Sequence, residues 1–176
     1  MLSSGACAFP SLPSFLRSPE RSFTVQDLLI TIEDLPHGWK VKSGPGKLID
    51  NSRSFDTVSI DFTPVTEPDR RPVLQMVFRY DPIWGGAKHD YSEHARFSSN
   101  TVIEEWSFES ETADESKFSC YTYSNKEYPN CRWLARYEEF VVDTIIHFDP
   151  EIMSFEEMKS IIVAMDQKMA SYLNDE

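Results

Sequence analysis

The sequence predicts one α+β domain: a single antiparallel β-sheet of about six or seven strands, packed with a long C-terminal helix and a second, mid-chain helix. Several short segments alternate apolar and polar residues, a pattern that is typical of strands. Apolar residues at three- and four-residue intervals mark residues 154–173 as a helix. The length of 176 residues suits a single domain.

The charge balance narrows the classes of partner. Twenty-nine acidic residues against 17 basic ones give a net charge of −12. This argues against a nucleic-acid binder, whose affinity comes largely from Lys and Arg at phosphates. It also argues against docking to an anionic membrane through a basic face. No apolar run approaches 18 residues, so the sequence predicts no membrane-spanning segment.

Residues 1–22 differ in composition from residues 23–176. Prolines 10, 13 and 19, together with several serines, favour an extended, solvated segment. We interpret residues 1–22 as a flexible tether and residues 23–176 as the domain.

The tether contains Ser4-Gly5-Ala6-Cys7. This stretch resembles the end of a bacterial lipoprotein signal, in which small residues precede the cysteine that receives lipid. Ser4 stands where that family expects Leu, and the basic start and apolar stretch expected before it are absent. The resemblance implies lipidation of Cys7, and the alternative is a free cysteine in a solvated tail.

Strand and helix positions follow from the pattern along the chain. Thr24, with Asp27 three residues later, predicts a short helix that ends at residues 34–36. The composition of residues 43–46 predicts a turn. Apolar and polar residues alternate over residues 56–63, which predicts a strand with one solvated face. A mid-chain helix is expected at 87–103, and Ser154 with Glu157 predicts a capping box for the last helix. Strands are predicted at residues 39–42, 56–63, 73–80, 106–110, 117–123, 131–137 and 140–148.

Two of these strands are separated only by Glu138-Glu139, which fits a two-residue hairpin. That register places Tyr137 opposite Phe140, Ala135 opposite Val142 and Trp133 opposite Thr144. The second strand is apolar on both faces, so both of its faces are expected to be covered.

Cys120 and Cys131 lie near facing ends of two predicted strands, with a polar segment between them. Antiparallel pairing about the midpoint brings the two residues opposite each other, within reach of a disulfide. We predict that they form one, and the alternative is two buried free thiols. A disulfide implies an oxidising, extracytoplasmic compartment.

The sequence shows no catalytic motif. There is no Gly-x-Ser-x-Gly, no His-Glu-x-x-His and no phosphate-binding glycine loop. His89 and His94 are five residues apart, which on a helix separates them by about 140°, so they cannot share a metal ion. We therefore predict no catalytic, cofactor-binding or metal-binding residues.

The densest acidic stretch suggests a binding surface for a partner or a cation. The same stretch would otherwise be a solvated strand edge whose charge prevents aggregation. Large aromatic residues nearby could line a cleft with it or belong to the core. The surface that we predict consists of Glu104, Glu105, Glu109, Glu111, Trp84 and Trp106.

One further motif is Asp34-Leu35-Pro36-His37-Gly38-Trp39, preceded by the apolar triplet at residues 28–30. It resembles the opening of many small bacterial lipoproteins and sensor-type extracytoplasmic domains. The order of elements over residues 24–174 resembles the PsbP-like fold. Members of that fold are mostly assembly factors, stabilising subunits and binding modules, and the resemblance carries over no catalytic residues.

We therefore expect a non-catalytic extracytoplasmic binding or accessory domain, which a lipid on Cys7 would anchor to a membrane. Its partner would be a protein or a small molecule and not a nucleic acid. Two alternatives remain open. One is a hydrolase with scattered carboxylates, such as Glu138 or Asp143, beside a tryptophan-lined cleft. The other is a cytoplasmic partner-binding domain with reduced cysteines.

Overall fold

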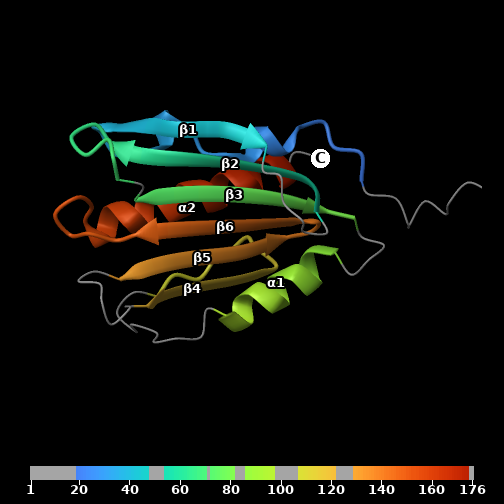
Figure 1. Cartoon of the computed structure of the whole chain (residues 1–176). Helices are drawn as coiled ribbons and strands as arrows, with labels where there is room; N and C mark the ends of the chain where they lie inside the picture. Colours follow the sequence, from blue (N-terminus) through green and yellow to red (C-terminus); the bar gives the residue numbers. More distant parts are fainter. Residues whose placement is uncertain are drawn as a thin grey trace, which may run out of the picture.

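The computed structural model describes residues 19–47, 54–70, 72–81, 86–97, 107–121 and 129–174. Six antiparallel strands form one sheet in the order β1-β2-β3-β6-β5-β4 (Figure 1). The predicted fold class is confirmed. The strands are β1 (Trp39–Lys47), β2 (Ser54–Pro64), β3 (Val73–Tyr80), β4 (Glu115–Tyr121), β5 (Asn130–Tyr137) and β6 (Phe140–His147). The helices are α1 (Gly86–Phe97) and α2 (Phe155–Asn174), with 3₁₀ turns η2 (Val25–Leu28) and η3 (Ile32–Asp34).

The two α-helices lie on opposite faces of the sheet (Figure 1). On one face, the predicted apolar stripe of α2 is buried in the large core cluster, which also contains Trp133, Val142 and Ile146. On the other face, α1 belongs to a smaller cluster in which Ala87 and Tyr91 accompany side chains of β3, β5 and β6. β6 is therefore covered on both faces, as its apolar sequence predicted.

The capping box at the start of α2 is present. Ser154 donates its backbone N–H to Glu157 Oε2 at 2.7 Å, and the Glu157 N–H donates to Ser154 Oγ at 3.2 Å. These contacts satisfy backbone donors that the first turn of a helix leaves without partners. The sequence signal was therefore sufficient to fix this terminus.

The register predicted for the β5–β6 hairpin is also confirmed. Tyr137 pairs with Phe140, Ala135 with Val142 and Trp133 with Thr144. Glu138, the first turn residue, has a positive φ of 50°. This left-handed conformation lets two residues reverse the chain without glycine.

The disulfide predicted between Cys120 and Cys131 is present. The two residues are direct partners in the β4–β5 register, with Cα atoms 4.0 Å apart. Both are buried in the large core cluster.

Two predictions for the first strands were wrong. Residues 43–46 do not end β1, which runs on to Lys47 with two irregularities in its pairing with β2. β2 has no fully solvated face, because Asp61 and Thr63 are buried. Their polar atoms are satisfied inside: Asp61 accepts a hydrogen bond from Ser43, and Thr63 Oγ1 donates to the Glu67 carbonyl at 2.7 Å.

Two further elements differ from expectation, and a third is described only in part. The helix predicted at Thr24 is replaced by η2 and η3, with Asp27 accepting from the Thr24 N–H at 2.8 Å. α1 is described only to Phe97, so the predicted continuation to residue 103 lies outside the described residues. Residues 107–110 are not a strand. Ser110 Oγ instead donates to Asp166 Oδ1 on α2 at 2.5 Å, which holds this segment against the helix.

Candidate functional site

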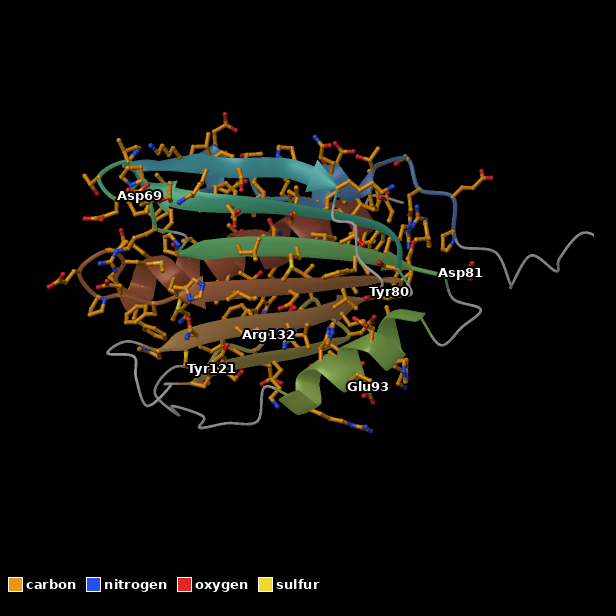
Figure 2. The ribbon with its side chains drawn as sticks, in the orientation of Figure 1. Asp69, Tyr80, Asp81, Glu93, Tyr121 and Arg132 are labelled. Carbon is orange, nitrogen blue, oxygen red and sulfur yellow. A yellow bond between two sulfur atoms is a disulfide. The ribbon has the colours of Figure 1, made fainter. Side chains whose placement is uncertain are left out.

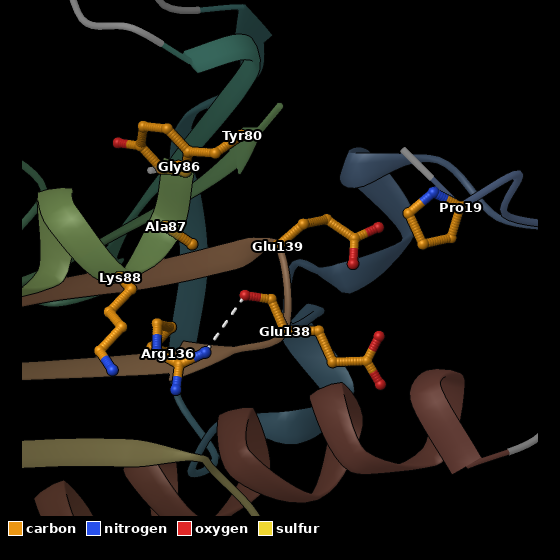
Figure 3. A pocket seen from close by; sticks show the side chains of 8 residues that line it. All are labelled: Pro19, Tyr80, Gly86, Ala87, Lys88, Arg136, Glu138 and Glu139. Atoms are coloured by element: carbon orange, nitrogen blue, oxygen red, sulfur yellow. Dashed lines mark hydrogen bonds between the residues drawn. The ribbon is translucent and has the colours of Figure 1, made fainter. Parts of the chain in front are cut away.

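A pocket of about 340 Å³ lies at one end of the sheet, between the first turn of α1 and the β5–β6 hairpin (Figure 3). Pro19 closes a third side. It belongs to residues 19–23, which we call the N-terminal strap. The pocket is lined by Pro19, Tyr80, Gly86, Ala87, Lys88, Arg136, Glu138 and Glu139.

Local backbone geometry sets the α1 side of this pocket. Gly86 has a φ of +34°, and a Cβ built on it would lie 2.9 Å from the backbone oxygen of Asp81. A larger residue is therefore strained here, both by φ and by contact with backbone. The close approach brings the start of α1 down onto the end of β3, where Ala87 is buried against Tyr80.

The hairpin supplies the opposite side. The Tyr80 N–H donates to the Glu139 carbonyl at 2.9 Å, which ties the end of β3 to the turn. Arg136 Nη1 donates to the Glu138 carbonyl at 3.4 Å, the dashed line in Figure 3. In the same view, Lys88 and Arg136 lie on one side of the pocket and the two glutamates on the other.

The strap is held to the hairpin by Arg21. Its guanidinium donates from Nε to Glu139 Oε1 at 2.9 Å and from Nη2 to Glu139 Oε2 at 2.6 Å. It also pairs with Glu138 and lies 5.9 Å and 5.8 Å from the ring centroids of Phe23 and Phe140. Only 6% of its side chain is exposed. The last residues of the predicted tether therefore contact the domain, whereas residues 1–18 lie outside the described residues.

Most charged groups around the pocket are ion-paired. Arg136 binds Asp114 and Glu115, each at 2.8 Å. Glu139 binds Arg79 as well as Arg21. Lys88 is exposed, and no carboxylate of the described residues lies within ion-pair distance of its ammonium group. It is the pocket cation that a ligand could bind without displacing a protein partner.

A second polar group lies between α1 and the sheet. Arg132 on β5 forms two hydrogen bonds to Asp143 on β6, at 2.7 and 2.6 Å. Arg132 lies on the same face of the sheet as α1 (Figure 2). Asp90 and His94 lie one turn apart on α1, with Oδ2 and Nδ1 separated by 3.2 Å.

The environment shifts the titration of the α1 pair. The contact with Asp90 raises the pKa of His94 above 6.5, against burial and the charge of Arg132, which act to lower it. Burial acts to raise the pKa of Asp90, but the contacts with His94 and Tyr80 outweigh it and hold the pKa below 3.8. The pair is therefore charged over the acidic part of the physiological range.

A third group surrounds Asp166, a buried carboxylate of α2. Ser110 and Thr112 donate to its Oδ1 at 2.5 and 2.9 Å, and the Tyr137 hydroxyl donates to the same atom. Burial, followed by the contact with Asp166, raises the pKa of Tyr137 far above its usual range. Tyr137 is therefore a fixed hydrogen-bond donor, which ties the hairpin to α2.

The predicted binding surface is only partly described. Glu109 and Glu111 are exposed on the segment before β4, and Glu111 lines a second pocket with Asp114 and Glu138. Cys7, Trp84, Glu104, Glu105 and Trp106 lie outside the described residues. Trp133 belongs to the core and is packed edge-on against Phe108.

Of the residues that line the pocket, the sequence alone singled out Glu138, as a candidate carboxylate of the hydrolase alternative. Arg21 was assigned to the tether. One local signal was available, because Asp90 and His94 are four residues apart on a predicted helix. The strap contacts left no such signal, since Arg21 and Glu139 are 118 positions apart.

Neither metal ligands nor a membrane span emerges from the described residues. No three of their His, Cys, Asp or Glu side chains are grouped so as to hold a metal ion. None of their helices is long and apolar enough to cross a membrane. Comparison of the chain with protein-family models, with curated proteins and with solved structures returned no match.

Proposed function

We propose that this chain is a non-catalytic extracytoplasmic binding or accessory domain, and that the pocket beside Lys88 is its ligand site. The ligand class that we propose is a small amphipathic molecule with an anionic group. The observation that carries this proposal is the composition of the pocket. Pro19, Tyr80 and Ala87 give it apolar walls, and Lys88 stands at its edge without an ion-pair partner among the described residues. Ligand pockets commonly combine apolar walls with a few polar groups.

The ion pairs around the pocket support a binding role over a catalytic one. A general acid or base must exchange a proton with substrate, and a nucleophile must be free to attack. Glu139 is held by two arginines, and Arg136 by two carboxylates. Asp143, a candidate for hydrolase chemistry, is bound in the same way by Arg132. Such groups give a rigid, pre-organised wall, which favours binding.

The disulfide supports the extracytoplasmic location. Bonds of this kind persist in oxidising compartments and are rare in the cytosol. Lipidation of Cys7 would add a membrane anchor, and an accessory role follows the PsbP-like resemblance of the sequence.

Binding is tested with the anionic dye anilinonaphthalene sulfonate. We expect saturable fluorescence enhancement, and we expect Lys88→Glu to weaken the affinity about fivefold, because it replaces an attractive charge by a repulsive one. Lys159→Glu is the matched control, since Lys159 is also an exposed lysine on a helix but lies on α2. Equal effects of the two substitutions would contradict the proposed site.

The compartment is tested on protein recovered from its native cells after free thiols are blocked with an alkylating reagent. We expect mass spectrometry to find the Cys120 and Cys131 peptides joined. Alkylation of both cysteines would instead assign the chain to a reducing compartment.

A further inference from the structure

We infer that the N-terminal strap is a gate for the pocket, and that closure of the strap and occupancy of the pocket favour each other. The inference rests on the proposed function only for its ligand, because opening of the gate is measurable without one. Reciprocal coupling of this kind is a thermodynamic necessity wherever a ligand contacts only one of two states.

The strap is a partition between two hollows. Pro19 lines the pocket beside Lys88, and it also lines a neighbouring hollow of about 530 Å³. The other residues around that hollow are Glu20, Arg21, Phe55, Arg79 and Asp81. Movement of residues 19–21 away from the sheet would remove a wall from the first pocket and join the two spaces.

Two arginines hold the partition in place. Arg79 Nη2 donates to the Pro19 carbonyl at 2.6 Å, and Arg21 binds the hairpin glutamates from the strap side. Both guanidinium groups meet at Glu139, with Arg79 Nη2 at 3.3 Å from Oε1. Glu139 also lines the pocket and accepts the Tyr80 N–H through its carbonyl. The same residue therefore belongs to the latch and to the pocket wall, which supplies a direct path for coupling.

The strap is built to hinge near Ser22. Phe23 packs against Phe140 and Tyr172, with ring centroids 5.9 and 5.2 Å apart, and anchors the chain to the core. Pro19 and Glu20 are exposed, so their outer side faces solvent. Exposed segments with few buried apolar contacts open at a lower free energy than the core. Loss of the arginine contacts would release residues 19–21 while Phe23 stays packed.

The gate is tested by thiol labelling. Ala87→Cys places a reporter on the buried wall of the pocket, in a Cys7→Ser background that removes the tail cysteine. We expect Arg21→Met to accelerate labelling of this cysteine about tenfold, which corresponds to about 1.4 kcal/mol of lost closure free energy. Arg70→Met is the matched control, because it removes a guanidinium that pairs with a buried carboxylate, Asp149, away from both the strap and α1. Equal labelling of the two variants would overturn the gate.

A second measurement separates the gate from the proposed function. Hydrogen exchange of residues 19–23 is followed by mass spectrometry with and without saturating anilinonaphthalene sulfonate. We expect the dye to slow exchange of these residues in the wild-type chain but not in Arg21→Met. If labelling is accelerated and the dye binds elsewhere, the gate stands and the proposed ligand site fails. If dye binding depends on Lys88 and Arg21→Met changes neither labelling nor exchange, the gate fails and the ligand site stands.

Discussion

Cys120 on β4 and Cys131 on β5 are direct partners in the sheet register, and their disulfide ties an edge strand to its only neighbour in the strand order. An edge strand has hydrogen-bonded pairing on one side only, so it is the part of a sheet that separates most easily. The covalent bond therefore reinforces a strand that has backbone pairing on one side only.

Removal of this bond should destabilise the domain. We expect the double variant Cys120→Ala/Cys131→Ala to lose about 3 kcal/mol of unfolding free energy, because the bond restricts a short loop in the unfolded chain. Urea denaturation followed by circular dichroism measures the change. Wild-type protein in a reducing buffer should show the same loss. Equal unfolding midpoints in reducing and oxidising buffer would contradict a stabilising disulfide.

The disulfide and the hairpin could be predicted because their geometry is local. A two-residue turn at Glu138 fixes which residues of β5 and β6 pair, and an eleven-residue separation fixes the cysteine pair about its midpoint. The capping box of α2 is local in the same sense. In each case the residues that specify the contact lie within about one turn or one hairpin.

The pocket could not be predicted because its parts come together only in the folded chain. The contact between Arg21 and Glu139 joins residues 118 positions apart. Composition alone assigned Arg21 to a solvated segment, since Pro and Ser surround it. The burial of Asp61 and Thr63 was missed for a related reason, because an alternating pattern is interpreted as if its polar side chains stayed in solvent. Hydrogen-bond partners inside the fold instead offset the free-energy cost of burying these two side chains.

The ion pair between Arg132 and Asp143 gives a second prediction. Asp143 is 4% exposed, and we expect Arg132→Met to cost about 3–5 kcal/mol of unfolding free energy, because it leaves a buried carboxylate without its cation. Urea denaturation of the purified variant measures this loss.

A double substitution provides the control for that prediction. Arg132→Met/Asp143→Leu removes both charges, so we expect it to recover most of the stability that Arg132→Met alone loses. A double variant no more stable than the single one would assign the loss to packing of the arginine stem rather than to the unpaired charge.

Stability should depend on pH through Asp90 and His94. The folded-state pKa of His94 is raised above 6.5, so its contribution is complete below that pH and is lost as pH rises through the folded value. The folded-state pKa of Asp90 is lowered below 3.8, so its contribution is complete above that pH and is lost as pH falls through the folded value. Both contributions are present together between about pH 4 and pH 6.5.

His94→Gln tests this window through urea midpoints. We expect the variant to be less stable than wild type near pH 5.5 and to approach it near about pH 8.5, where neutral His94 loses its charge contact. His37→Gln, at an exposed residue before β1, is the control. A loss in His94→Gln that is equal at both pH values would show that the side chain acts by packing alone.

Two glycines of β1 give a matched pair for a backbone prediction. Gly44 has a φ of +93°, and a Cβ built there would lie 2.6 Å from the backbone oxygen of Ser59. Gly46, two residues further along the same strand, has no atom within 4 Å of such a Cβ. We expect Gly44→Ala to cost about 2 kcal/mol of unfolding free energy, because the left-handed conformation and the contact with β2 both oppose a side chain. Gly46→Ala should change stability by less than about 0.5 kcal/mol.

Since the close atom at Gly44 is backbone of the paired strand, relief of the contact requires the irregular pairing of β1 with β2 to shift. Hydrogen exchange of β1 and β2 should therefore accelerate in Gly44→Ala and not in Gly46→Ala, and equal exchange in the two variants would contradict the strain at Gly44.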